Sequence, residues 1–241
     1  DVYKRQYYNR PTQEGMFQHF SAVAGAINLP IILYNVPSRT GCDLANDTIL
    51  RLSQIENIVG LKDATGDVQR GAALIQSLSE GFAVYSGDDG TTCDLLEAGA
   101  KGCVSVTANV APSEMAEMCR LALAGDMSAA RAVDQKVHRL HQTLFLEPNP
   151  IPVKYAMGYM GLIEPTMRLP LTPLSAQFQG EVPKAIDECL NERHWYCSLL
   201  WLACQVAACC LIPARSSLGR QNPSYPAVSY THLTLPTSHC V

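Results

Sequence analysis

The 241-residue sequence lacks the patterns that identify several classes of protein. It has no basic run, since 18 Lys and Arg are scattered among 22 Asp and Glu, which argues against a nucleic-acid-binding surface. Its ten cysteines include no C-x-x-C pair and no zinc-like spacing, so we predict no metal site. The apolar run at 197–211 is shorter than the roughly 20 residues that span a bilayer, so we predict no membrane partner.

Charge is almost absent from the end of the chain. Arg215 and Arg220 are the only charged side chains after residue 194, whereas 38 of the 40 charged residues precede them. Six of the ten cysteines also fall after residue 188, and the earlier ones are isolated, as is usual in a reducing, intracellular compartment. One composition does not describe the whole chain. We therefore expect residues 191–241 to be an unrelated tail that is non-native or disordered.

Short apolar segments alternate with helical patterns between residues 13 and 125. The continuous apolar character of strands buried on both faces is found at 30–37, 57–63, 82–86 and 102–107. Helical periodicity is found at 13–27, 44–53, 67–79 and 89–98. Strands that alternate with helices through short links predict a parallel α/β sheet.

Helical patterns continue after the last predicted strand, at 112–124, 127–146 and 150–160. The chain therefore supplies four strand–helix units and a helical end. A closed (β/α)8 barrel needs eight strands and a doubly wound sheet can have five or six, so the pattern alone leaves the two architectures open.

Two reactive side chains lie near the carboxyl ends of neighbouring predicted strands. Lys62 follows an apolar run, and the loss of hydration there favours the neutral, nucleophilic amine that forms Schiff bases. Alternatively, its stem lines the strand end while its ammonium pairs with Asp63. Tyr34 holds the matching place on the preceding strand, where a phenol could exchange protons with an amine. Alternatively, it is a core aromatic residue with a satisfied hydroxyl.

Charged residues also occupy two of the predicted strand-to-helix loops. Arg39 could hold a carboxylate with two hydrogen bonds, or be an ordinary surface arginine. Asp88 and Asp89 suit acid–base chemistry or a metal, but a helix is expected to begin near Thr91. Because a carboxylate at that position caps free N–H groups, we interpret one of the two as a helix cap.

Six short motifs, in order and with matching separations, resemble the later part of the dihydrodipicolinate synthase (4-hydroxy-tetrahydrodipicolinate synthase) family of pyruvate-dependent class I lyases and aldolases. The resemblance covers residues 7–178. The motifs are Tyr7–Pro11, Tyr34–Gly41, Gly60–Gly66, Ser86–Asp89, Val104–Asn109 and Pro148–Lys154.

The resemblance implies a partial (β/α)8 TIM barrel with extra C-terminal helices. Residues 7–125 would form the last four strand–helix units, and residues 126–190 the C-terminal helical region. Residues 1–6 would be a non-native leader. The first half of the family's barrel then has no counterpart, including the Thr–Thr loop that binds the carboxylate of pyruvate.

The resemblance also implies catalytic roles for three residues. Lys62 matches the lysine that forms an imine with pyruvate. Tyr34 matches the tyrosine that shuttles protons during that step and during cyclisation. Tyr8 matches a tyrosine that reaches across a dimer interface to complete the neighbouring site. Since the electrophile is built on the lysine, neither a metal nor an organic cofactor is expected.

Further residues match positions that contact the substrates. Arg39 matches an arginine that helps bind the carboxylate of L-aspartate 4-semialdehyde, while Gly87 and Val104 match backbone positions that line the pocket. The implied reaction condenses pyruvate with that aldehyde to give 4-hydroxy-tetrahydrodipicolinate for lysine and diaminopimelate biosynthesis. The implied protein is a cytoplasmic homotetramer.

Two other functions remain open. N-acetylneuraminate lyase and other keto-sugar-acid aldolases of the same superfamily share the lysine and the strand tyrosine, although they usually lack an arginine at the position of Arg39. In the second alternative the chain by itself is a catalytically inert fragment, because the Thr–Thr loop is absent.

Overall fold

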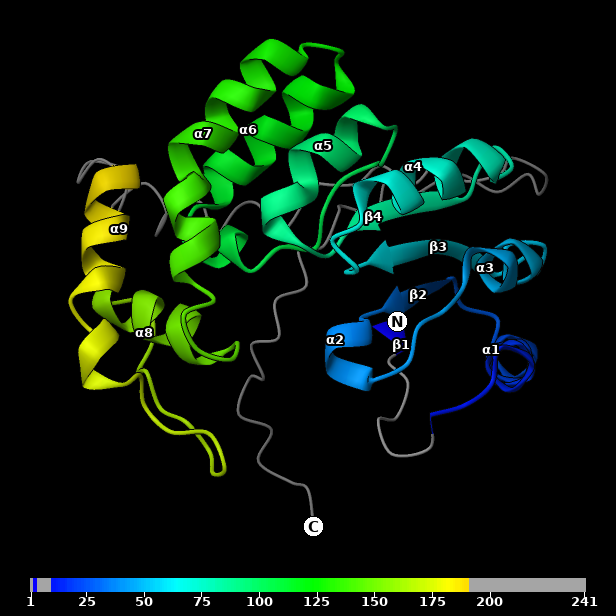
Figure 1. Ribbon diagram of the computed structural model, residues 1–241, viewed down its shortest axis with the longest axis horizontal. Helices are drawn as coiled ribbons and strands as arrows, with labels where there is room; N and C mark the ends of the chain where they lie inside the picture. The colour runs from blue at the N-terminus through cyan, green and yellow to red at the C-terminus, as the bar shows by residue number, and fades with distance from the viewer. Residues whose placement is uncertain (1, 4–9, 191–241) are drawn as a thin grey trace.

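The computed structural model describes residues 2–3 and 10–190, and its centre is a parallel β-sheet (Figure 1). The strands are β1 (Val2–Tyr3), β2 (Ile31–Asn35), β3 (Ile58–Asp63) and β4 (Ala83–Ser86), paired in that order. All three pairings are parallel. The order never reverses, whereas a doubly wound sheet reverses at a switch point. The described strands therefore follow one another as neighbours do in a barrel wall.

The prediction of a strand at 102–107 is wrong. The structure has only one isolated β-bridge in this segment, between Ser86 and Cys103. The reason is the carboxylate of Asp89, whose Oδ2 accepts the N–H groups of Val106 and Thr107 at 3.0 and 2.8 Å. A side chain that captures backbone donors ends a strand ladder. The 3₁₀ turn η2 (Thr107–Asn109) follows instead.

The helix-cap interpretation of Asp88 and Asp89 is also wrong. The structure has no side-chain cap at the start of the 3₁₀ turn η1 (Asp89–Thr91) or of helix α5 (Thr92–Glu97). Asp88 instead accepts the hydroxyl of Thr91 at 2.7 Å, and Asp89 is turned toward residues 106 and 107.

The helices around the sheet agree closely with the predicted ranges. These are α1 (Gln13–Ala26), α3 (Asn46–Leu52), α4 (Val68–Ser77) and α5. A single-turn helix, α2 (Pro37–Thr40), was not predicted. It starts at a proline and ends at Gly41, whose φ of 65° is left-handed, and these two residue types begin and end helices efficiently.

The C-terminal helical region packs beside the β4 end of the sheet. It consists of α6 (Pro112–Leu123), α7 (Met127–Thr143), α8 (Ile151–Tyr159), the 3₁₀ turn η3 (Ala176–Phe178) and α9 (Glu181–Cys189). Helix contacts run in sequence from α1 through α3, α4, α5, α6 and α7 to α9, which also contacts α8. Within residues 10–190, no helix is both long and apolar enough to cross a membrane. Residues 191–241, which are expected to form a tail, lie outside the described residues, and the boundaries expected for the tail and the leader stay predictions.

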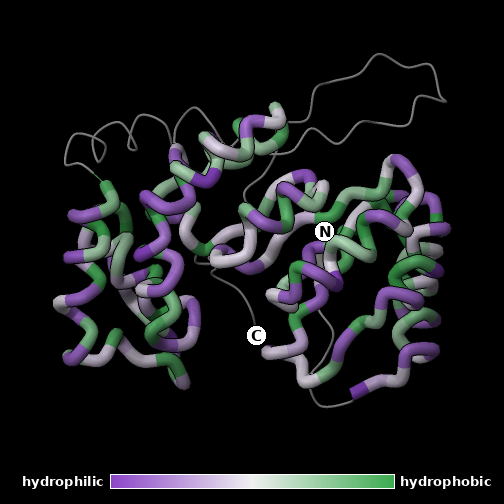
Figure 2. Tube along the Cα trace, turned by 45° about the horizontal axis from the view of Figure 1, so that its top comes forward, coloured by the Kyte–Doolittle hydropathy of each residue, from purple (hydrophilic) through white to green (hydrophobic). Residues whose placement is uncertain are grey.

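Two hydrophobic clusters hold these layers together. One joins α1 and α3 to β2 and β3, and includes Leu33 and Leu61, which are fully buried and are register partners. The other joins β4 to the helices α5 to α9. Figure 2 shows hydrophobic and hydrophilic residues interleaved along the helices, as amphipathic packing requires. Because side chains alternate along a strand, the residues after Leu33 and Leu61 point to the opposite face of the sheet.

Gly60 allows β3 and β4 to approach closely. A methyl group there would lie 2.7 Å from the carbonyl oxygen of Ala83, a backbone atom that cannot turn aside. We expect Gly60→Ala to lower the free energy of unfolding by about 2 kcal/mol, because the strands must separate. Urea denaturation measures this change.

Gly25→Ala in α1 is the matched control, since a methyl there would meet no atom within 4 Å. Alanine is favoured over glycine in helices by about 0.5–1 kcal/mol, so this variant should be neutral or more stable. Equal urea midpoints for the two variants would contradict the close approach.

Candidate active site

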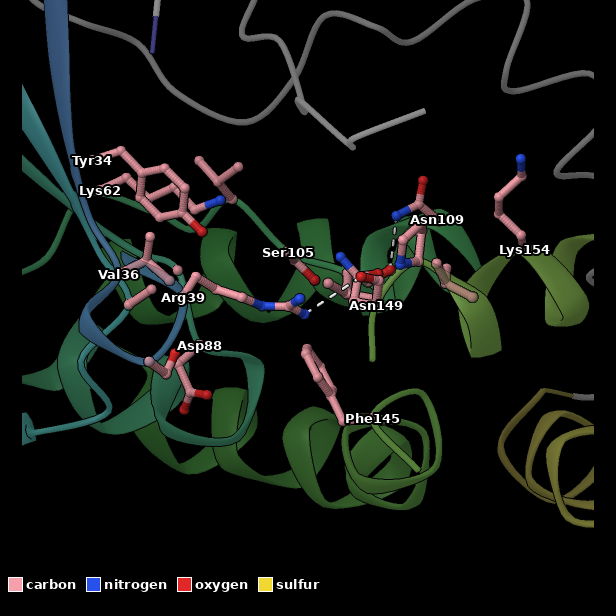
Figure 3. A pocket seen from close by; sticks show the side chains of 17 residues that line it. Tyr34, Val36, Arg39, Lys62, Asp88, Ser105, Asn109, Phe145, Asn149 and Lys154 are labelled. Atoms are coloured by element: carbon pink, nitrogen blue, oxygen red, sulfur yellow. Dashed lines mark hydrogen bonds between the residues drawn. The ribbon is translucent and has the colours of Figure 1, made fainter. Parts of the chain in front are cut away.

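Tyr34 and Lys62 lie side by side near the carboxyl ends of β2 and β3 (Figure 3). They are register partners, and the Lys62 Nζ lies 4.2 Å from the centroid of the Tyr34 ring. Both are buried, with 9% of Tyr34 and 7% of Lys62 exposed. Strand alternation places them on the face opposite Leu33 and Leu61. The sheet therefore brings an amine and a phenol together where both are shielded from solvent.

A cavity of about 130 Å³ lies over this pair, at the carboxyl end of the sheet. That end is where parallel α/β folds bind their ligands. Loops after β2, β3 and β4 line one side, and the helical region lines the other. The lining includes five of the six predicted site residues: Tyr34, Arg39, Lys62, Gly87 and Val104. The sixth, Tyr8, lies outside the described residues, and the roles of all six stay predictions.

Gly87 makes room for the Lys62 side chain. A methyl group on Gly87 would lie 2.8 Å from the Lys62 Cε and 2.8 Å from the Ala64 Cβ. The N–H of Gly87 donates to the Asp63 carbonyl at 2.7 Å, which fixes the loop after β4 against β3. The lysine stem is thus packed directly against loop backbone.

Burial raises the pKa of Tyr34, and the positive charge of Arg39 partly opposes that rise. Because the ordinary phenol pKa is already about 10, Tyr34 is protonated at neutral pH. A protonated phenol beside an amine can donate a proton as a carbonyl group reacts and recover it afterwards. The raised pKa therefore keeps Tyr34 in the protonated form, from which such a relay would start.

Arg39 reaches across the mouth of the cavity from α2. Its Nη2 donates to the carbonyl of Asn149 at 3.4 Å, in the loop before α8 (Figure 3). The guanidinium is exposed and has further donors with which to hold a carboxylate. Arg39 thus places a fixed positive charge at the cavity entrance.

Several lining residues were not predicted as site residues. Asn149 and Lys154 belong to the sixth motif, so their position in that motif was an available signal. The Lys154 Nζ donates to the Thr166 carbonyl at 2.5 Å. Phe145 also lines the cavity although 45% of it is exposed, and no sequence pattern marked it.

The chain is similar in sequence and in fold to one protein family. Residues 5–189 match the sequence profile of the Dihydrodipicolinate synthetase family. The chain belongs to this family. It is 59% identical over 182 residues to the 4-hydroxy-tetrahydrodipicolinate synthase of Nitrosospira multiformis, and 58% identical over 181 residues to that of Marinobacter nauticus. These alignments cover 76% and 75% of this chain.

The chain spans 61% and 62% of the length of these two dihydrodipicolinate synthetase relatives. Its fold matches the crystal structure of a chloride-inhibited dihydrodipicolinate synthase from Acinetobacter baumannii complexed with pyruvate. That match has a TM-score of 0.75 and 55% identity, and covers 76% of this chain and 63% of the other. A synthase from Cyanidioschyzon merolae with lysine bound matches with a TM-score of 0.73 and 36% identity, over 76% and 62% of the two chains.

Proposed function

We propose that the chain carries the imine-forming site of a synthase that condenses pyruvate with L-aspartate 4-semialdehyde. The product is 4-hydroxy-tetrahydrodipicolinate, for lysine and diaminopimelate biosynthesis. The observation that carries this proposal is the buried Lys62 amine, 4.2 Å from the ring centroid of Tyr34 beneath a cavity. The names of the relatives and the pyruvate complex of the Acinetobacter baumannii structure support it.

In the proposed reaction, the Lys62 Nζ attacks the ketone carbon of pyruvate and water leaves, which gives an imine. Tyr34 supplies the proton that the departing oxygen needs and later takes one back. The imine withdraws electrons, so the methyl group of pyruvate loses a proton and becomes an enamine carbon nucleophile. That carbon attacks the aldehyde, and the substrate's own amine then closes the ring and displaces Lys62. The electron sink is made from the lysine itself, so the proposal includes no cofactor or metal.

Arg39 is proposed to select the second substrate. A guanidinium can hold a carboxylate through two parallel hydrogen bonds, and Arg39 places this group above the Lys62–Tyr34 pair. Gly87 and Val104 limit the space around the imine. Tyr8 is proposed to join the relay from a neighbouring subunit of a homotetramer.

We place this site in a partial (β/α)8 barrel. Residues 7–125 would be the last four strand–helix units, with the fourth strand reduced to the bridge between Ser86 and Cys103, and residues 126–190 the C-terminal helices. The one-directional strand order and the match to solved synthases support the arrangement. In this proposal the protein acts in the cytoplasm. The chain by itself is proposed to form the imine but to show negligible turnover beside a complete synthase, since its relatives are longer and are proposed to hold the pyruvate carboxylate with the Thr–Thr loop.

The substrate assignment is tested with purified chain, pyruvate and borohydride, which reduces an imine to a stable adduct. We expect a covalent pyruvate adduct in the intact mass. We also expect only trace consumption of L-aspartate 4-semialdehyde with pyruvate, and no cleavage of N-acetylneuraminate, because Arg39 suits a short aldehyde acid. The complete synthase of Nitrosospira multiformis, assayed alongside, should be much faster.

Each alternative has its own outcome. Cleavage of N-acetylneuraminate would replace the synthase with the sugar-acid lyase. Absence of the adduct would favour the inert fragment. Condensation as fast as that of the complete relative would contradict the negligible turnover proposed for the chain alone.

A further inference from the structure

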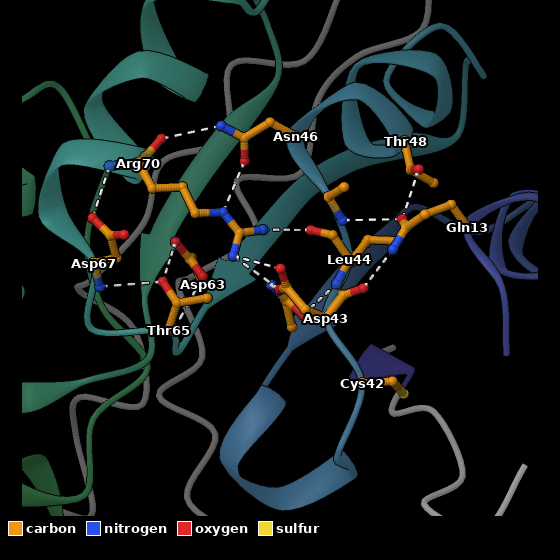
Figure 4. A network of polar contacts seen from close by, with 12 residues as sticks. Gln13, Cys42, Asp43, Leu44, Asn46, Thr48, Asp63, Thr65, Asp67 and Arg70 are labelled. Atoms are coloured by element: carbon orange, nitrogen blue, oxygen red, sulfur yellow. Dashed lines mark hydrogen bonds and ion pairs between the residues drawn. The ribbon is translucent and has the colours of Figure 1, made fainter. Parts of the chain in front are cut away.

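The linker Asp43–Asn46, which leads from α2 into α3 and includes the first residue of α3, is held by side chains from three other elements (Figure 4). Gln13 of α1 donates to the carbonyl of Asp43 at 2.8 Å and accepts the N–H of Ala45 at 3.1 Å. Asn35 of β2 and Arg70 of α4 hold the linker from the other sides. A four-residue connection with this many side-chain partners is fixed in place.

Arg70 makes the largest share of these contacts. Its Nη1 lies 2.9 Å from both carboxylate oxygens of Asp43, its Nη2 donates to the Leu44 carbonyl at 2.6 Å, and its Nε donates to the Asn46 Oδ1 at 3.1 Å. Only 22% of the Arg70 side chain is exposed, whereas 46% of the Asp43 side chain is, so the bonds to Leu44 and Asn46 are the better shielded from solvent. The planar guanidinium reaches three partners in this linker, which the single ammonium of a lysine cannot do.

Asn35 connects the linker to the catalytic strands. It is fully buried, and its side chain donates to the Asp43 Oδ1 at 2.9 Å and accepts the N–H of Leu44 at 3.1 Å. Its own carbonyl accepts the N–H of Ala64 at 2.9 Å, just after β3. Asn35 follows Tyr34 and therefore points to the opposite face of the sheet. The linker is thus tied to the back of the strands whose front carries Tyr34 and Lys62.

Arg39 is joined to this linker through Thr40, Gly41 and Cys42, and the Thr40 hydroxyl donates to the Cys42 carbonyl at 2.9 Å. Arg39 lies in α2, a single turn that spans Pro37–Thr40, and isolated turns of helix are unstable in water. The turn is therefore positioned by the segments at its two ends, which are β2 and the linker. Displacement of Asp43–Asn46 would move the Arg39 guanidinium over the cavity.

We propose that Arg70 is a positioning residue, whose hold on the linker Asp43–Asn46 sets where α2 places Arg39 above the Lys62–Tyr34 cavity. The inference rests on the proposed function, in which Arg39 binds the carboxylate of the aldehyde substrate. Arg70 is on the far side of the sheet and touches no substrate in this account.

The test separates pyruvate capture from aldehyde binding. Wild-type chain, Arg70→Met and Arg70→Lys are first reduced with pyruvate and borohydride, and the yield of adduct is measured. The purified adducts are then titrated calorimetrically with succinate semialdehyde, which has the aldehyde and the carboxylate of the proposed substrate. Arg51→Met is the matched control, because the guanidinium of Arg51 forms an exposed ion pair with Glu14 at 2.9 Å instead of bonding to the linker.

We expect Arg70→Met to raise the Kd for succinate semialdehyde about tenfold or more while leaving the adduct yield unchanged, since small misplacements of a binding group cost this much. Arg70→Lys should lie between Arg70→Met and wild type, and Arg51→Met should equal wild type. Adding Arg39→Met to Arg70→Met should cause little further loss, because both changes remove the same interaction. An unchanged Kd, or equal losses of adduct and affinity, would overturn the proposal.

Amide hydrogen exchange tests the positioning role of Arg70 independently of the proposed function. In Arg70→Met the amides of Leu44 and Ala45 should exchange about tenfold faster, because their partners Asn35 and Gln13 no longer face a fixed linker. Peptides from β3 should not change. Equal exchange in Arg70→Met and Arg51→Met, or acceleration throughout the chain, would refute the positioning role. A wild-type adduct that fails to bind the aldehyde acid would contradict the proposed function instead.

Discussion

Lys62→Met is expected to abolish the pyruvate adduct completely. Methionine retains most of the length and apolar character of the lysine stem beside Gly87 and Ala64, but it has no amine with which to form an imine. Because the chemistry needs that nitrogen, no residual adduct is expected at this position. The measurement is the intact mass of the chain after reaction with pyruvate and borohydride.

Lys101→Met is the matched control. Lys101 has an exposed side chain and lies after α5, outside the lining of the cavity, so its loss should leave the yield of adduct unchanged. An adduct that persists in Lys62→Met and disappears in Lys101→Met would move the reactive amine away from the cavity.

Gly87→Ala is expected to lower the initial rate of adduct formation about tenfold or more, because it displaces the reacting amine. The added methyl would stand 2.8 Å from both the Lys62 Cε and the Ala64 Cβ. Ala64 cannot turn aside, so either the lysine leaves its place beside Tyr34 or the loop moves away from β3. The initial rate of adduct formation measures the loss.

Gly90→Ala controls for the change from glycine in the same loop. A methyl on Gly90 would meet only the Asp88 Oδ2, at an ordinary 3.9 Å, so capture of pyruvate should be normal. Circular dichroism and urea denaturation establish that both variants fold. If a folded Gly87→Ala captured pyruvate as fast as Gly90→Ala, the close packing of Lys62 would be irrelevant to its chemistry.

The strands that carry the reactive pair were predictable from sequence. Leu33 and Leu61 belong to continuous apolar runs, and such runs indicate strands buried on both faces. Neighbouring parallel strands end at the same edge of a sheet, so the proximity of Tyr34 and Lys62 follows from their matching places in those runs. The loop position of Arg39 also indicated a carboxylate-binding role from sequence, and the family motifs added Gly87 and Val104.

Other features depend on contacts between distant residues, and local patterns do not report these. The apolar run at 102–107 has the pattern of a strand. However, the Asp89 carboxylate accepts the N–H groups of Val106 and Thr107, which lie 17 and 18 residues after it in the sequence. Phe145 reaches the cavity only because the helical region packs beside β4.

The contacts that Arg70 and Asn35 make with the linker Asp43–Asn46 could not be predicted from local sequence either. Arg70 and Asp43 are 27 residues apart, and neither resembles a site residue by its sequence neighbours alone. Asn35 is fully buried within a strand that reads as apolar, and the reason for a polar residue there is its pair of bonds to the linker. Such residues are identified only when the packing of the elements is known.

The most direct test of the proposed imine at Lys62 is to locate the adduct on the wild-type chain. After reaction with pyruvate and borohydride, the protein is digested and its peptides are sequenced by tandem mass spectrometry. We expect the reduced pyruvate group on Lys62 and on no other lysine. A group attached to Lys101 or Lys154, or no attached group at all, would contradict the proposed imine.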